Sequence, residues 1–471
     1  MYAGITGEWI NPSFIAGSPY VLDVNLVTVH SYFDNNYLYI YPTNVPDLID
    51  DDGENKIKLD NTQQKEYGTW AKYWIENRDN NNWGKNAYLN VLVQGPSFMF
   101  NYKKWSFSIE DDARVAFSAV HISPLAAKLA YEDADSLTYL PFQNRELAIT
   151  KFRINAAAWD EIGITVARQL ENNKNWEVNC GITLKHLNGI AGGYCINNGI
   201  DITIPNYTSL YFKDLSVKCG YADNLDANKA QTATVCGTGT STDLGVTFEK
   251  KTVKNSYQCP NFCDKALDLQ YLWKLGFSLV DIGYINFNQC TNNYTVNNGS
   301  DDWVNITKIR AKGQSGLDSI LKAHFTDFVY SKNNFTMMLP WAASVQFDYN
   351  IGYNLYINGT WVQRIPHFGL IGVDRANSIA ITPKYDTRRF GVALPITFYD
   401  YLWPRAGIAF RFNNFLIVGS DKIGCILGQS LSGEDFYVSL KFSILKICRK
   451  HKRKGLPSFL PDMNFINQRH N

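Results

Sequence analysis

The stretch that decides the fold is Trp176-Glu-Val-Asn-Cys-Gly-Ile-Thr-Leu-Lys185, in which apolar side chains alternate with polar or small ones. A strand has this period of two when one face meets apolar surroundings and the other face meets polar ones. The run extends from Asn175 to Leu187, longer than the about five or six residues of an ordinary strand. It is long enough for a membrane-crossing strand, which needs about 9 to 11 residues. The stretch therefore predicts a strand of a transmembrane β-barrel.

The same alternation recurs along the chain, for example from Trp273 to Leu279 and from Phe436 to Ile444. We expect about sixteen strands, an even number as in single-chain bacterial barrels, and merging one pair would give about fourteen. The predicted strands are 20–41, 88–101, 104–119, 156–170, 176–188, 194–204, 208–221, 242–251, 270–285, 334–348, 351–364, 376–385, 389–399, 404–412, 415–422 and 434–446. The predicted fold is thus all-β, a transmembrane antiparallel barrel of about 14 to 16 strands.

The spacing of these strands predicts three regions: an N-terminal plug or periplasmic segment over 1–19, the barrel with its loops over 20–446, and a basic periplasmic tail over 447–471. Such barrels have short periplasmic turns and long extracellular loops. The long connections expected outside are 43–87, 120–155, 222–241 and 286–333, and the turns expected inside include 102–103, 171–175, 349–350, 386–388 and 413–414. Two short helices, Pro124–Glu132 and Leu317–Val329, are expected within long connections, where each caps the barrel or folds into its lumen.

Composition agrees with a barrel in a bilayer. The chain has 28 Tyr, 27 Phe and 12 Trp, side chains that membrane-interface girdles require. No run reaches the roughly 20 apolar residues of a transmembrane helix. The first residues lack a basic start followed by an apolar stretch, so we expect an exported protein whose signal peptide has been removed. The predicted location is the bacterial cell outer membrane.

Alternation also assigns side chains to the two faces of the barrel wall. The residues expected to face lipid are Trp176, Ile182, Leu184, Leu275, Phe277, Val438 and Leu440. Glu110, Asp112 and Arg114 share the polar face of one strand and are expected to form a lumen charge cluster, either a salt-bridge network in a plugged barrel or a ring that selects ions. Asp111 would face lipid in that register, so we expect a bulge or register shift near it.

Catalytic, metal and cofactor sites are not predicted. The seven histidines are widely separated, and the nine cysteines show no repeated metal-type spacing, so we expect no enzyme and at most one disulfide. With 45 basic and 44 acidic side chains the chain has no charge excess that would indicate nucleic acid. A basic tail follows the last strand and is a solvated boundary or a contact with anionic lipid or cell-wall polymer. Its charged residues are Arg449, Lys450, Lys452, Arg453 and Lys454.

Several stretches resemble a family of Bacteroidota outer-membrane β-barrels of unassigned function. The similar stretches are Tyr2–Ser13, Leu279–Ile285, Arg405–Phe412, Val418–Asp421 and Gly433–Phe442, so the resemblance spans nearly the whole chain. It implies the barrel class and the outer-membrane location. Members of that family often continue into an OmpA-like, peptidoglycan-binding domain. The printed residues contain no such domain, so peptidoglycan contact, through the tail or a missing domain, is left open.

Two functions remain open at this stage. The first is a non-enzymatic structural or accessory barrel that docks to other envelope proteins through its extracellular loops. The second is a passive channel or transporter for small apolar molecules, similar to fatty-acid-transporter barrels, with residues 1–19 as its plug. A weaker third possibility is a phage or adhesin receptor. Outer-membrane lipid is an expected partner in each case.

Overall fold

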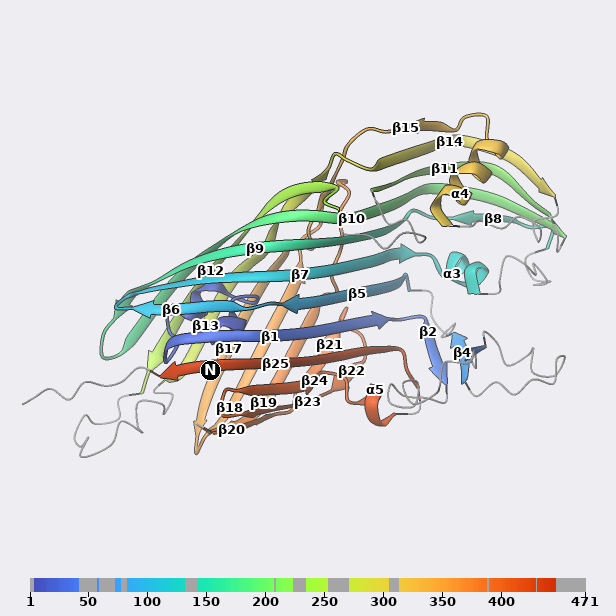
Figure 1. Cartoon of the computed structure of the whole chain (residues 1–471). Helices are drawn as coiled ribbons and strands as arrows, with labels where there is room; N and C mark the ends of the chain where they lie inside the picture. The colour runs from blue at the N-terminus through green and yellow to red at the C-terminus, as the bar shows by residue number, and fades with distance from the viewer. Residues whose placement is uncertain are drawn as a thin grey trace, which may run out of the picture.

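The computed structural model describes residues 4–41, 57–58, 73–77, 83–131, 143–206, 209–222, 234–252, 271–304, 313–387, 389–428 and 430–445. Its main feature is a closed antiparallel barrel (Figure 1), which β1 (Tyr20–Asn35) completes by pairing with β25 (Gly433–Leu445) on one side and with β5 (Lys85–Gln94) and β6 (Ser97–Tyr102) on the other. Within the part of the chain that the structure describes, no helix is both long and apolar enough to cross a membrane.

The barrel wall has fourteen positions, because several positions are built from two short strands in line. After β1, β5 and β6 the wall continues through β7 (Trp105–Ile122), β8 (Glu146–Ile149) with β9 (Phe152–Asn172), β10 (Trp176–Asn206), β12 (Gly237–Lys251) and β13 (Tyr271–Phe287). It closes through β16 (Phe335–Met338) with β17 (Ala342–Gly352), β18 (Leu355–Arg364), β19 (Ser378–Asp386), β20 (Phe390–Ala393) with β21 (Ile396–Tyr399), β22 (Pro404–Ala406) with β23 (Ile408–Phe412), β24 (Leu416–Ser420) and β25.

The lower of the two predicted strand numbers is therefore confirmed, and two differences explain why sixteen is wrong. The predicted strands 176–188 and 194–204 are one strand, β10, which continues past a register shift between Gly189 and Ala191. The predicted strand 208–221 is β11 (Ser209–Ala222), which pairs with the upper part of β10 but does not belong to the wall. β12 pairs with the lower part of β10 and continues the barrel.

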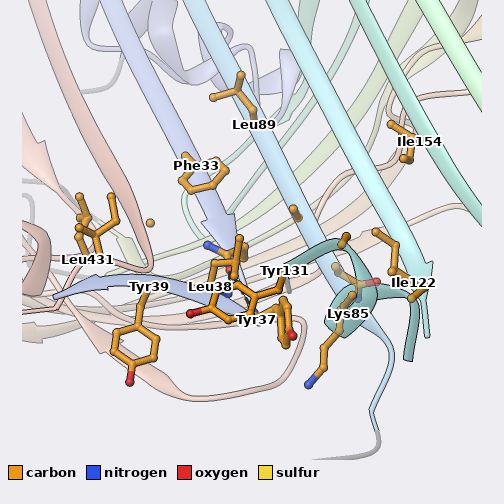
Figure 2. Close-up of a pocket in the computed structure, with 18 of the residues that line it drawn as sticks. Phe33, Tyr37, Leu38, Tyr39, Lys85, Leu89, Ile122, Tyr131, Ile154 and Leu431 are labelled. Carbon is orange, nitrogen blue, oxygen red and sulfur yellow. Dashed lines mark hydrogen bonds between the residues drawn. The ribbon is translucent and has the colours of Figure 1, made fainter. Parts of the chain in front are cut away.

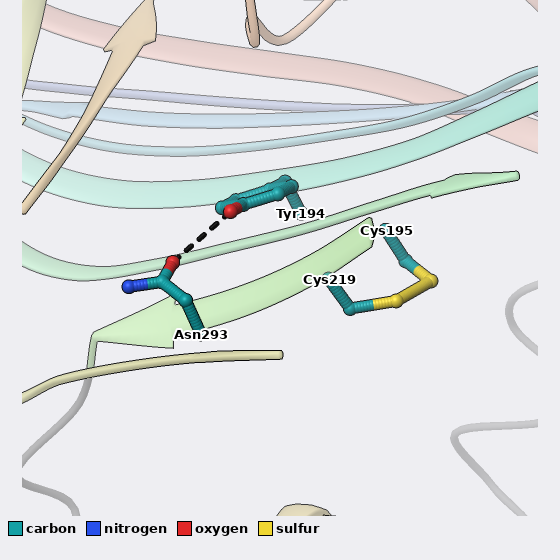
Figure 3. Close-up of a disulfide and its surroundings, with 4 residues drawn as sticks. All are labelled: Tyr194, Cys195, Cys219 and Asn293. Carbon is teal, nitrogen blue, oxygen red and sulfur yellow. Dashed lines mark hydrogen bonds between the residues drawn. A yellow bond between two sulfur atoms is a disulfide. The ribbon is translucent and has the colours of Figure 1, made fainter. Parts of the chain in front are cut away.

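β11 pairs on its other side with β14 (Thr291–Val304), so the two strands form a sheet that extends β10 beyond the barrel (Figure 1). β15 (Val329–Ser331) adds a short edge strand that pairs with β14. α4 (Gly313–His324) packs its Leu321 side chain into a buried apolar cluster with Leu215 of β11 and Val296 of β14. A disulfide between Cys195 and Cys219 joins β10 to β11 (Figure 3). The expected long loop 286–333 thus contains two strands and a helix in its described residues.

The remaining elements lie at the barrel ends. α3 (Pro124–Tyr131) and α4 correspond to the two predicted helices, and α5 (Gly424–Leu427) was not predicted. β2 (Leu38–Tyr41), β3 (Ile57–Lys58) and β4 (Tyr73–Asn77) form a small separate sheet after β1. The tight turns fall close to their predicted places, for instance at residues 173–175 between β9 and β10 and at 413–415 between β23 and β24. The basic tail, with Arg449 to Lys454, lies outside the described residues.

Candidate functional site

The lumen of the barrel is occupied by the chain's own N-terminal segment. η1 (Gly4–Gly7) and η2 (Pro12–Ile15) lie inside the wall at the end where β1 begins (Figure 1), and the Ile5 and Ile15 side chains are fully buried. We call residues 4–18 the plug. Pro12 at the first position of η2 favours the helical turn, and the Asn11 side chain accepts a hydrogen bond from the Ser13 N–H at 3.0 Å.

Polar contacts bind the plug to strands on several sides of the lumen. The Asn11 side-chain amide donates to the carbonyls of Val246 on β12 and Phe277 on β13 and to Gln346 Oε1 on β17, at 3.4, 3.2 and 3.0 Å. Glu8 Oε2 accepts from Ser108 on β7 at 2.6 Å and from Thr165 on β9 at 2.7 Å. These contacts provide hydrogen-bond partners for buried polar groups of both the plug and the wall.

Glycines let the plug approach the wall closely. A Cβ atom at Gly181 of β10 would lie 2.6 Å from the Pro12 carbonyl carbon, and one at Gly245 of β12 would lie 2.0 Å from Asn11 Oδ1. Gly181 and Gly245 are paired across the two strands, so together they form a flat place on the inner wall. The plug backbone fits there only because neither residue has a side chain.

A buried network of charges lies above the plug. Arg114 on β7 donates to both carboxylate oxygens of Asp281 on β13, at 2.7 and 3.1 Å, and lies 3.4 Å from Glu161 on β9. Lys185 on β10 lies 3.1 Å from Glu161 and 3.1 Å from Asp243 on β12. The network therefore links the neighbouring wall strands β7, β9, β10, β12 and β13 through charge-assisted hydrogen bonds.

The three residues that the sequence placed in the lumen all lie in or next to this network. Glu110 and Asp112 are each 1% exposed, and Arg114 is 7% exposed. Glu110 lies 3.8 Å from Lys185, and Asp112 accepts a hydrogen bond from the Trp9 indole of the plug at 3.2 Å. Arg114 instead pairs with the carboxylates of other strands, which the sequence did not indicate.

The Glu8 carboxyl brings a further acidic group from the plug to this region. Burial raises the pKa of Glu8 well above its usual range, and the negative charge of Glu110 raises that pKa further. The hydrogen bonds from Ser108 and Thr165 oppose this rise because they stabilise the charged form. The plug thus meets the wall through a carboxyl group that retains its proton more readily than an exposed one.

Asp281 reaches the lumen because of a bulge. Alternation from Trp273 to Leu279 would place residue 281 on the outer face of the barrel. The pairing of β12 with β13 shifts between Thr242 and Leu244, and Asp281 has a φ of 60°, in the left-handed region. Its N–H donates to Asp243 at 2.6 Å. A single bulge therefore turns this carboxylate toward Arg114.

A second inward segment, residues 365–377 between β18 and β19, covers the network from the other side. Its Asp374 lies 3.1 Å from Arg153 on β9, and its Gly372 carbonyl accepts from Asn155 at 2.7 Å. Val373, 1% exposed, belongs to a buried apolar cluster with wall residues that include Trp159 and Phe287. For the two helices the sequence left open whether each caps the barrel or folds into its lumen; α4 packs on the β11–β14 extension and α3 lies at the rim beside β2.

The residues expected to face lipid all lie on the side of the wall away from this filling. Trp176, Ile182, Leu184 and Phe277 are 36%, 40%, 59% and 42% exposed, whereas Thr183 between two of them is fully buried. Leu275, Val438 and Leu440 are half-buried. Among the described residues, no group of three or more His, Cys, Asp or Glu side chains could hold a metal ion.

Several solved structures are similar to this chain at low identity and with TM-scores below 0.5. A Pseudomonas aeruginosa FadL homologue has 10% identity and a TM-score of 0.37, with 92% of each chain covered. The Pseudomonas putida toluene transporter TodX has 8% identity and a TM-score of 0.32, with 93% of this chain and 94% of that chain covered. The outer membrane protease OmpT from Escherichia coli has 7% identity and a TM-score of 0.20, with 89% of this chain and 96% of that chain covered.

No curated protein matches the chain in sequence. A family model described as a family of unknown function (DUF5723) matches residues 12–421, which run from the plug through β24 and include every member of the buried charge network. The chain therefore belongs to the DUF5723 family of unknown function.

Proposed function

We propose that this protein is a non-conducting barrel of the bacterial outer membrane with a structural or accessory role, docking to other envelope proteins. The observation that carries the proposal is the plug, because residues 4–18 are hydrogen-bonded to β7, β9, β12, β13 and β17 across the lumen. A wide barrel of this size conducts only if its lumen holds an aqueous path. With the lumen filled, contact surfaces outside the wall are the remaining means of action. The Bacteroidota origin stays a prediction.

The extension of β10, β11 and β14 offers such a surface. It stands beyond the barrel wall and exposes Val329 and Tyr330 on its edge strand, at 60% and 45%. An edge strand leaves backbone groups open to pairing with another chain. Exposed apolar side chains on such an edge favour a protein partner. The role is proposed as non-enzymatic.

The alternative, a passive channel for small apolar molecules, requires the plug to leave the lumen. The buried charges would then meet the apolar cargo, because Arg114, Glu161 and Lys185 line the inner wall above the plug. Contact between an apolar solute and charged side chains is unfavourable. The geometry therefore favours the accessory role.

The experiment is purification of the full chain from native cells in mild detergent, followed by mass spectrometry. We expect an envelope protein to co-purify in stoichiometric amount, and the double variant Val329→Asp with Tyr330→Asp to lose it. Lys213→Asp, at a 65% exposed position on β11, is the matched control and should keep the partner. Absence of any stoichiometric protein from the wild-type preparation would contradict the accessory role.

A further inference from the structure

A cavity of about 760 Å³ lies on the outer side of the wall, at the end of the barrel remote from the plug (Figure 2). Its floor includes Phe33 of β1, Leu89 of β5 and Ile154 of β9. Each of these side chains belongs to the outward face of its strand, because the neighbouring Tyr32, Tyr88 and Asn155 are buried on the inner side. The cavity is therefore separate from the lumen and from the charge network.

Two elements outside the barrel form the cavity's other walls. α3 contributes small residues, among them Ala127 and Ala130. β2 contributes Leu38 and Tyr39, and Tyr37 lines the cavity just before β2 begins (Figure 2). Small residues on the helix leave space between it and the wall. A volume of this size is far above a packing void and falls within the range of about 300 to 1,000 Å³ found for ligand sites.

The floor of the cavity continues downward into the apolar outer surface of the barrel. On the outer face of β5, β7 and β9 lie Val93, Val115 and Ile162, which are 39%, 42% and 48% exposed. The floor residues themselves are only half-exposed because α3 and β2 cover them. The medium that meets the outer wall of such a barrel is lipid hydrocarbon. An apolar cavity that opens from this surface is filled most favourably by a hydrocarbon chain.

We propose that this cavity binds one lipid molecule of the outer leaflet, with an acyl chain between α3, β2 and the outer wall. The outer leaflet is the source because the tight turns lie at the plug end of the barrel, which places the cavity end outside. The lining has one basic side chain, Lys85, and one acidic side chain, Glu434, and Lys85 is 2% exposed. The cavity thus recognises the lipid through its chain. This inference goes beyond the docking role and does not depend on it.

The test uses purified full-length protein in nanodiscs of phosphatidylethanolamine and phosphatidylglycerol. Lipids retained after stepwise delipidation are counted by native mass spectrometry. Wild-type protein is expected to retain one tightly bound lipid. Ala127→Trp on α3 and Leu89→Trp on the floor each fill the cavity, and each should lower retention of that lipid at least tenfold. Ile162→Trp, on the exposed outer wall, is the matched control and should retain it.

The two filling variants lie on different elements, and the folding of each is checked by heat-dependent migration in gels. One correctly folded filling variant is enough for the test. Retention of the lipid by a folded filling variant would overturn the proposal. Retention of a protein or peptide in place of lipid, lost in the filling variants, would assign the cavity to a protein partner and would also overturn it. Either failure leaves the plugged lumen and its tests unaffected, because the cavity lies outside the wall.

Discussion

At the scale of single residues, Arg114 is a buried cation that joins β7 to β13 across the inner wall. It pairs with Asp281 on β13 through two hydrogen bonds and lies 4.9 Å from the centre of the Trp159 ring. A buried ion pair is costly to break from one side, because the remaining charge is left without a partner. The position is therefore sensitive to removal of charge even when volume is kept.

We predict that Arg114→Met lowers the free energy of unfolding by about 3 to 5 kcal/mol. Urea titration of the refolded protein in detergent, followed by tryptophan fluorescence, measures this. Arg168→Met is the control, because Arg168 is an exposed arginine that lies over the Trp105 ring on the outer face, and it should cost less than about 1 kcal/mol.

The double variant Arg114→Met with Asp281→Asn should be less destabilised than the sum of the two single variants, since each single change orphans the other charge. Additive losses would show that the two residues act independently and would contradict the bidentate pair.

Sequence reasoning at this scale found Glu110, Asp112 and Arg114 because they alternate on one strand, but it missed their partners. Asp281 stands on the outward register of β13, and only the bulge turns it inward. The available sign of this bulge was an acidic residue at a position that strict alternation would place against lipid. Asp111 also stands on a lipid-facing register, but it stays exposed on the outer face. The register shift near it places one extra residue in the neighbouring wall position, between Gln94 of β5 and Phe98 of β6.

At the scale of elements, the plug is a short segment whose regular structure is limited to the two single-turn helices η1 and η2. Its position therefore depends on its contacts with the barrel wall. Gly181 and Gly245 provide the flat surface, and the wall supplies acceptors for Asn11 on three strands. The place of residues 1–19 before the first predicted strand suggested that they could form a plug. The glycines on β10 and β12 could have supported that prediction, since inward glycines on adjacent strands indicate close approach of another backbone.

We predict that Gly181→Leu displaces the plug, because the new side chain would occupy the space of Pro12. Liposomes that contain the variant should swell faster in isosmotic sugar than liposomes with wild-type protein. Gly359→Leu is the control, since a Cβ there meets no atom within 4 Å, and it should swell at the wild-type rate. A folded Gly181→Leu barrel with the wild-type swelling rate would show that the plug does not control access.

The strand register gives another prediction at this scale. Nitroxide labels at Leu184, Phe277 and Val438 should collide with lipid-soluble oxygen more often than labels at Glu177, Thr183 and Lys274. The physical reason is that side chains in the second set lie on the inner face, where Thr183 is fully buried and Glu177 is 9% exposed. Greater oxygen collision at the second set would mean that the register is inverted.

The elements that the sequence did not resolve share one physical cause. Alternation shows that a segment is a strand with two different faces, but it does not show which strand it pairs with. β10 therefore looked like two wall strands, and β11 looked like a third, although β11 pairs with β14 outside the barrel. The pairing depends on contacts far apart in the sequence, which periodicity does not report.

At the scale of the whole molecule, one end of the barrel has tight turns, except for the connection 252–270 between β12 and β13, and the other end has long connections. The plug lies at the first of these ends (Figure 1). The sequence predicted this division because it depends only on the lengths between strands. Short turns at one end are typical of the periplasmic side. The lumen filling could not be predicted to the same degree, because the 365–377 segment carries no pattern that distinguishes an inward loop from an exposed one.

This arrangement predicts the orientation of the protein in cells. Protease added to whole cells should cut within 43–87 and 286–333 and should spare the turn at 171–175. Disrupted cells serve as the control, because the protease can then reach both sides. Cleavage of intact cells at 171–175 would mean that the barrel is inserted the other way.

The central claim, a lumen filled by the chain itself, is tested most directly by single-channel recording of purified wild-type protein in planar bilayers. With the plug bound to both sides of the wall and the charges of Arg114 and Lys185 paired, we expect no steady conductance at moderate voltage. A barrel variant that lacks residues 4–18 should conduct and serves as the positive control. Steady nanosiemens-scale conductance from the wild-type protein would contradict the claim and would favour a channel.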